Sequence, residues 1–134
     1  MENMLSFSRL KILDLAHNLI TEVEGLENCR QLMTLNLSFN KIRNITDCEQ
    51  LKELPKLNHL DLRSNFIEDA DNVVPFVGDL PAVHTLFLNN NPCLNMIRHS
   101  RRKLIVANKT LFILNDREVS EVERERVEAF AEGG

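Results

Sequence analysis

The chain of 134 residues contains no tryptophan and no tyrosine, and it has only four glycines and four prolines. So few glycines leave no glycine-rich loop of the kind that cradles phosphate groups. The sequence also lacks a His-Glu-x-x-His motif and a nucleophile with a base at a fixed spacing. These absences predict that the protein is not an enzyme and that it binds no cofactor.

Long hydrophobic runs are missing too, because no apolar stretch approaches the roughly 18 residues that a membrane-spanning helix requires. The sequence shows no signal peptide. Its cysteines, Cys29, Cys48 and Cys93, make an odd number without metal-ligand spacing. Cys29 and Cys48 fall on apolar positions, where a thiol behaves as a small hydrophobic side chain. We therefore expect a protein of the cytosol or nucleus that does not contact membranes.

Leucine, in contrast, is abundant and regularly spaced. The stretch from Leu10 to Ile20, LKILDLAHNLI, follows the pattern L-x-x-L-x-L-x-x-N-x-I, and further copies start at Leu32, Leu57 and Val83. This pattern is the signature of a leucine-rich repeat. Side chains two residues apart in a strand point to the same side, so the leucines require an interior. One copy alone cannot bury them, and neighbouring copies must therefore stack.

The repeats together predict an α/β leucine-rich-repeat solenoid. It has a short parallel β-sheet on the concave face, turns, 3₁₀ segments and short helices on the convex face, and a C-terminal helical cap. We place the repeats at residues 10–31, 32–56, 57–82 and 83–91. Residues 1–9 form a partial repeat or an N-terminal cap, and residues 92–134 form the C-terminal cap.

Helix signals lie on the convex side and in the cap. Apolar spacing predicts a short helix over Thr46–Leu54, opened by Thr46 or Asp47. Composition predicts a second helix over Asn95–Ala107. Residues 111–116 match half of a fifth repeat, and a capping box from Ser120 to Glu123 opens a last helix over residues 120–131.

Each repeat closes its strand with an asparagine, whose amide can bond the backbone of its own turn and of the neighbouring repeat. A polar side chain inside the stack must be hydrogen-bonded, so we assign these residues a structural role. Stacking predicts an internal asparagine ladder formed by Asn18, Asn40, Asn65 and Asn91.

The residues between the leucines face the concave side, and we predict that they form a protein-binding surface. Phe39 and Phe87 are aromatic side chains on an otherwise polar face, which is typical of binding hot spots. For Phe39 the alternative is packing on the edge of its own repeat. The predicted binding residues are Asp14, Asn36, Phe39, His59, Asp61, Arg63, Phe87, Asn89 and Asn115.

Metal and nucleic acid are not the predicted ligands. Asp14 and Asp61 lie two strands apart, about 9 to 10 Å, whereas metal–ligand bonds are near 2 Å. The net charge is −4, and the basic cluster of Arg98, Arg101, Arg102, Lys103 and Lys109 lacks interleaved aromatic residues. We expect this cluster to pair with Asp116, Glu121 or Glu123 within the cap; nucleic-acid binding is the alternative.

The cap carries a resemblance to known proteins. Its elements are Arg101-Arg102, the segment from Leu111 to Val119 (LFILNDREV), and the segment from Glu125 to Gly134 (ERVEAFAEGG). The repeats resemble the 22-residue-type leucine-rich-repeat family, and the cap resembles the dynein axonemal assembly factor family. This implies a monomeric scaffold for cytoplasmic preassembly of axonemal dynein arms in cilia or flagella, binding a dynein subunit or a co-chaperone. The wider family implies two alternatives: regulation of protein phosphatase 1 by docking on it, or ribonucleoprotein assembly.

Overall fold

The leucine pattern forms a strand at the same place in all four copies: β1 (Ile12–Asp14), β2 (Thr34–Asn36), β3 (His59–Asp61) and β4 (Thr85–Phe87). Neighbouring strands pair in parallel, in a register that aligns their central leucines, Leu13, Leu35, Leu60 and Leu86. The structure is a computed structural model that describes residues 8–133. Most of the predicted N-terminal element, residues 1–7, lies outside the described residues.

Two further strands extend the sheet beyond the four repeats. β5 (Ile113–Leu114) pairs in parallel with β4, so the predicted half-repeat contributes a strand. β6 (Arg117–Glu118) then returns antiparallel to β5. Between them Asn115 and Asp116 have positive φ angles of 50° and 68°, the backbone of a two-residue type I′ hairpin. Our sequence reasoning missed this hairpin, although an Asn-Asp pair between short strands is a signal for it.

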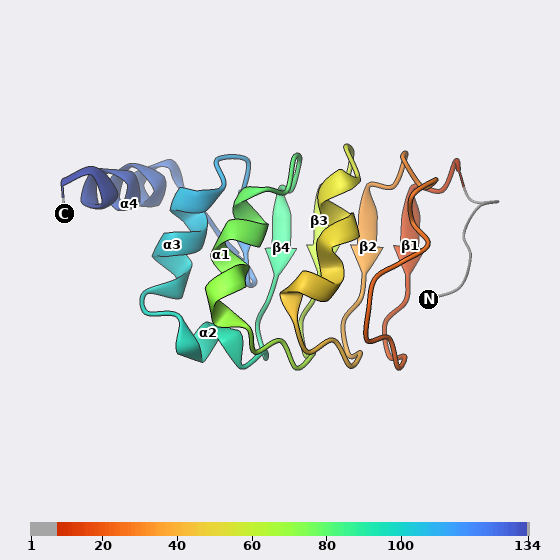
Figure 1. Ribbon diagram of the computed structural model, residues 1–134. Helices are drawn as coiled ribbons and strands as arrows, with labels where there is room; N and C mark the ends of the chain where they lie inside the picture. Colours follow the sequence, from red (N-terminus) through yellow and green to blue (C-terminus); the bar gives the residue numbers. More distant parts are fainter. Residues whose placement is uncertain (1–7, 134) are drawn as a thin grey trace.

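Helical segments lie over one face of the sheet, and the last of them, next to the C-terminus, extends past the end of the stack (Figure 1). They are the 3₁₀ helix η1 (Ile45–Glu53), α1 (Ala70–Gly78), α2 (Cys93–Met96), α3 (Ser100–Ala107) and α4 (Glu121–Gly133). α1 contacts both η1 and α3, and α3 contacts α4. Within the described residues, the connection from β1 to β2 contains no helix and consists of turns, as expected for a short repeat. The predicted solenoid, with its parallel sheet, convex helices and helical cap, is confirmed.

The core is one aliphatic layer between the sheet and the convex segments. Leu35, Leu60 and Leu86 are completely buried. The equivalent Leu13 of repeat one is only partly buried, because it lies at the end of the described stack. Full burial of a leucine contributes roughly 1.5–3 kcal/mol, so the stacking of repeats, rather than any single copy, stabilises the fold.

The N-terminus of η1 is capped by the following repeat. Asp69 Oδ1 accepts a hydrogen bond from the Ile45 backbone N–H at 2.7 Å, and Asp69 Oδ2 accepts one from the Thr46 N–H at 3.4 Å. The N-cap residue is Asn44, so the prediction that Thr46 or Asp47 opens this helix is wrong. Stacking brings a carboxylate of the next repeat onto the unpaired N–H groups of the helix, an arrangement that the sequence of one repeat does not reveal.

The predicted helix over Asn95–Ala107 is interrupted, which corrects that prediction. α2 ends at Met96 and α3 begins at Ser100, and His99 between them is left-handed with a φ of 55°. A left-handed residue cannot continue a right-handed helix. The interruption places α3 beside α1, where a Cβ on Gly78 would lie only 3.2 Å from the carbonyl oxygen of Ala107. Among residues 8–133, no helix has the length and apolar character needed to cross a membrane.

Candidate protein-binding face

The open face of the sheet carries the side chains that alternate with the core leucines, and the helices lie on the opposite face (Figure 1). Parallel register arranges these side chains in columns. The first strand residues form one column, Ile12, Thr34, His59 and Thr85. The third strand residues form the next, Asp14, Asn36, Asp61 and Phe87.

The polar members of the second column bond their own turns. Asp14 Oδ1 accepts a hydrogen bond from the Ala16 N–H at 3.0 Å, and Asp61 Oδ1 accepts one from the Arg63 N–H at 3.0 Å. Asn36 Oδ1 accepts from both the N–H and the hydroxyl of Ser38. Asp61 is only 3% exposed. The structure therefore gives these three predicted contact residues a local role in holding the end of each strand, and Asp61 is not accessible to a partner.

Four of the predicted residues come together at the centre of the face, and we call them the Phe87 cluster: His59, Asp61, Arg63 and Phe87. Arg63 Nη2 donates to Asp61 Oδ2 at 2.7 Å, and its guanidinium carbon lies 4.6 Å from the Phe87 ring centroid. The His59 and Phe87 ring centroids are 5.7 Å apart. The hydrogen bond to Asp61 holds the guanidinium over the ring and raises the pKa of Arg63. Phe87 itself stays partly exposed.

Phe39 lies apart from this cluster, at the turn after β2. Its ring stacks on His17 of the preceding repeat, with centroids 4.4 Å apart and an interplanar angle of 8°. Phe39 is 48% exposed, so it packs on a neighbouring repeat and still presents one ring face to solvent. Both residues adopt positive φ, 60° at His17 and 58° at Phe39, a conformation that is uncommon for bulky side chains.

Asn89 and Asn115 lie beside the Phe87 cluster at the cap end of the face. Asn115 Oδ1 accepts hydrogen bonds from the backbone N–H groups of Leu88 and Asn89, at 2.7 and 3.1 Å. These two bonds join the hairpin to β4, so Asn115 has a structural role in the fold. Asn89 remains partly exposed, and its buried Oδ1 has no hydrogen-bond partner among the described residues.

The ladder asparagines link successive turns through shared carbonyls. Asn65 Nδ2 donates to the carbonyl oxygens of Leu37 and Leu62, at 3.0 Å each, and its Oδ1 accepts from the Ile42 N–H at 3.2 Å. Asn40 and Asn91 repeat this arrangement one turn earlier and later. These three side chains are at most 4% exposed.

Asn18 departs from the prediction of an internal ladder. It is exposed, and its amide donates to Leu15 and Ala16, both in its own turn. The reason is its position in the first described repeat, where the described residues provide no earlier turn to bond. Asn18 therefore holds one turn, whereas the other three asparagines connect two.

The basic cluster of the cap is only partly paired with acids. Arg101 makes a two-pronged contact with Glu123, from Nε at 2.8 Å and from Nη2 at 2.9 Å, and Nη1 donates to the Leu114 carbonyl at 3.0 Å. Asp116 instead lies 3.8 Å from Arg63. The Ser120 hydroxyl caps α4 by accepting from the Glu123 N–H, but the Glu123 carboxylate is bound by Arg101. Pairing with Glu123 therefore accounts for Arg101 alone among the five basic residues.

This contact makes the cap sensitive to acid. Hydrogen bonding to Arg101 lowers the pKa of Glu123 below its ordinary value. A carboxyl with a lowered folded-state pKa stabilises the fold above its unfolded pKa, and the contribution is lost as the pH falls through the folded value. We expect urea unfolding to show a loss of stability below roughly pH 4. The loss should be smaller in Glu123→Gln, and identical pH profiles for the two proteins would contradict this assignment.

All three cysteines are buried. Burial raises the pKa of Cys93 to about 11 and also raises that of Cys48. Their thiols thus stay protonated at neutral pH and pack as small apolar groups. Among residues 8–133, no group of three or more histidine, cysteine, aspartate or glutamate side chains is placed to hold a metal ion.

Two pairs of surface side chains were not predicted from the sequence. Phe112, 45% exposed, stacks on His84 with centroids 5.0 Å apart, just before strands β5 and β4. Phe130, 53% exposed, lies under the guanidinium of Arg102 at 3.7 Å from its ring centroid. The repeat period signals the first pair, because the residue before each strand forms its own column. The second pair joins two helices of the cap and has no periodic signal.

Comparisons with known proteins agree with this architecture. A family model described as leucine-rich repeats in two copies matches residues 8–53. Leucine-rich repeat-containing protein 23 of Bos taurus is 37% identical over 91 residues, which are 68% of this chain and 26% of that protein. A dynein axonemal assembly factor 1 homolog of Drosophila pseudoobscura pseudoobscura is 32% identical over 103 residues, 77% of this chain and 6% of that protein. The chain thus spans 26% or less of the length of these curated relatives.

A solved structure matches over nearly the whole chain. A chain in the crystal structure of the Drosophila melanogaster SNF/U2A′ complex superposes with a TM-score of 0.83 at 25% sequence identity. The match covers 97% of this chain and 74% of that chain. The cap as well as the repeats therefore has a counterpart of known structure.

Proposed function

Because the chain belongs to the leucine-rich-repeat family, we propose that it is a non-enzymatic scaffold whose protein partner docks on the open face of its sheet. The observation that carries this proposal is the Phe87 cluster, where an arginine and a histidine fix a partly exposed aromatic ring. Anchored aromatic and arginine side chains dominate binding energy at interfaces. Parallel strands at about 4.8 Å make this face roughly 20 Å wide, enough for one helix of about 10–12 Å diameter.

The process that we propose for the scaffold is cytoplasmic preassembly of axonemal dynein arms. The resemblance of the cap to dynein axonemal assembly factors supports this role, as does the similarity to the Drosophila pseudoobscura pseudoobscura homolog over 103 residues. In this role the open face holds a dynein subunit or a co-chaperone. The protein then acts in the cytoplasm of a ciliated or flagellated cell.

A second candidate is ribonucleoprotein assembly, which the likeness to a chain of the SNF/U2A′ complex favours. Affinity purification from ciliated cells distinguishes the two roles. We expect the wild-type chain to capture dynein heavy chains. Capture of spliceosomal proteins, or of a phosphatase catalytic subunit, in place of dynein would overturn the proposed process but not the scaffold role.

The position of the docking site is tested by Phe87→Ala. Removing the anchor ring should weaken binding of the captured partner at least about tenfold. The melting temperature should change little, because the ring lies on the open face. Phe112→Ala is the matched control, since it also removes an aromatic ring in contact with a histidine, but at an exposed position outside the cluster. Equal partner affinity of Phe87→Ala and wild type, with the fold intact, would move the docking site elsewhere.

A further inference from the structure

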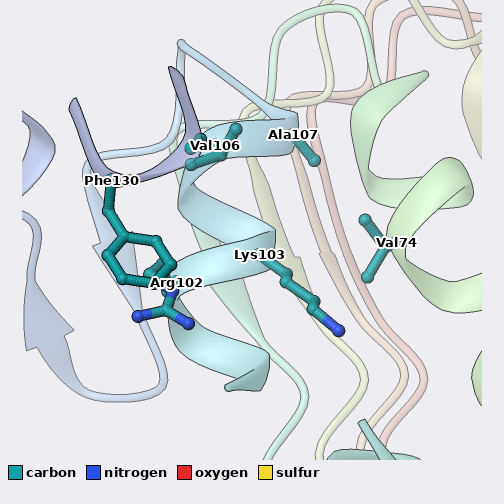
Figure 2. Close-up of a pocket in the computed structure, with 7 residues that line it drawn as sticks. Val74, Arg102, Lys103, Val106, Ala107 and Phe130 are labelled. Atoms are coloured by element: carbon teal, nitrogen blue, oxygen red, sulfur yellow. The ribbon is translucent and has the colours of Figure 1, made fainter. Parts of the chain in front are cut away.

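A second surface lies on the helical side of the molecule, at the cap. It is a groove of about 380 Å³ between α1, α3 and α4. Its apolar lining is Val74, Val106, Ala107, Phe130 and Ala131. Figure 2 shows Phe130 and Val74 on opposite sides, with α3 as the floor and Lys103 extending between them. We call it the cap groove; it shares no residue with the Phe87 cluster.

The charge around the cap groove is positive. The lining residues include Arg102 and Lys103 and no acidic residue. Neither of these two basic residues forms an ion pair with a side chain of residues 8–131. The charge of Arg102 lowers the pKa of the nearby His99, with smaller contributions from burial and then from the charges of Arg98 and Lys103. Cations that are near one another and lack acidic partners favour an anionic ligand.

Two glutamates of α4 pair with arginines outside the groove lining. Glu123 pairs with Arg101, and Glu128 lies 3.5 Å from Arg124, itself bonded to the carbonyls of Ile105, Asn108 and Leu111. The lining of the groove combines apolar side chains with two cations, one of which, Arg102, has its guanidinium carbon 3.7 Å from the Phe130 ring centroid. A guanidinium over an aromatic ring can still donate N–H hydrogen bonds to a carboxylate, and the ring can still make apolar contacts.

We propose that the cap groove binds an acidic amphipathic helix of a partner protein. Its apolar face would lie between Val74 and Phe130, in the helix-in-groove mode. Its carboxylates would pair with Arg102 and Lys103. The scaffold then has two docking surfaces on opposite faces, so that one chain holds two segments at once.

The test uses synthetic helical peptides of about 16 residues and ¹⁵N-labelled protein. One peptide carries leucines at i, i+3, i+4 and i+7 with glutamates on the other face. A second has the same composition in scrambled order, and a third replaces the glutamates by lysines. We expect the first to shift the amide signals of Val74, Val106 and Ala107, with affinity falling as salt rises. The other two should bind at least about tenfold more weakly.

Matched variants separate the groove from general charge effects. Lys103→Glu should weaken binding of the first peptide at least about tenfold, whereas Lys109→Glu makes the same charge change outside the lining and should not. Phe130→Ala should act like Lys103→Glu, and Phe112→Ala and Phe87→Ala should leave the affinity unchanged. Failure to bind at about 1 mM peptide, equal effects of the two lysine variants, or signal shifts confined to the Phe87 cluster would each overturn the proposal.

Discussion

Replacing Asn65 by alanine should lower the free energy of unfolding by about 3–5 kcal/mol. The substitution removes four hydrogen bonds of a residue that is 4% exposed. Without Asn65, the Leu37 carbonyl still accepts a hydrogen bond from Asn40, and the Leu62 carbonyl still accepts one from Asn91. The Ile42 N–H loses its side-chain acceptor, Asn65 Oδ1, and becomes a buried donor without an acceptor. Since small domains have only about 5–15 kcal/mol of stability, the variant should be near unfolding at 37 °C.

The control is Asn18→Ala, the same substitution at the same position of repeat one. Its exposed amide bonds only its own turn, so we expect a loss below about 1 kcal/mol. A third variant, Asn65→Asp, keeps an acceptor for Ile42 but sets a carboxylate against two carbonyls, and it should be nearly as damaging as alanine. Chemical denaturation of the three variants measures these differences. Equal losses for Asn18→Ala and Asn65→Ala would show that the ladder does not link the repeats.

The strands and the core were predictable from the sequence because their period comes from the backbone. Residues two apart in a strand share a face, and the leucines of four copies repeat that spacing, so β1 to β4 fall where the pattern places them. The cap of η1 and the hairpin were not predictable in this way. The carboxylate of Asp69 caps η1 from the next repeat, and β6 depends on the turn conformation of two residues, Asn115 and Asp116.

For the candidate site, the repeat pattern predicts where the side chains lie but not how they are bonded. The pattern correctly assigns side chains to the open face, but it does not say which of them are already bonded. A side-chain oxygen already accepts a hydrogen bond from a backbone N–H group in Asp61, Asn36 and Asn115. Phe87 occupies the same column as Asp61, and a phenyl ring cannot accept such a bond, so it remains available. The distinction therefore comes from the side-chain chemistry at each column position.

Replacing Arg101 by methionine should destabilise the cap by about 2–4 kcal/mol. Arg101 is 24% exposed and ties α3 to three cap segments: to α4 through Glu123, to β5 through the Leu114 carbonyl and to β6 through the Glu118 carbonyl. Methionine retains the apolar stem and leaves the Glu123 carboxylate with only the 3.5 Å contact to Arg117. In a stack each unit contacts only its neighbours. Amide hydrogen exchange should therefore accelerate in α4, β5 and β6 while β1 to β3 stay protected.

Arg117→Met is the matched control, because Arg117 touches the same carboxylate but is 69% exposed. An exposed pair contributes about 0–1 kcal/mol, so hydrogen exchange in α4 should change little. Equal acceleration in both variants would assign the effect to lost charge rather than to the Arg101 contacts.

The Arg101→Met variant also tests the cap groove. Phe130 is one wall of that groove and belongs to α4, so release of α4 in Arg101→Met should abolish binding of the acidic peptide. The Phe87 cluster rests on β3 and β4, and its partner should still bind, which would separate the two surfaces by a single substitution.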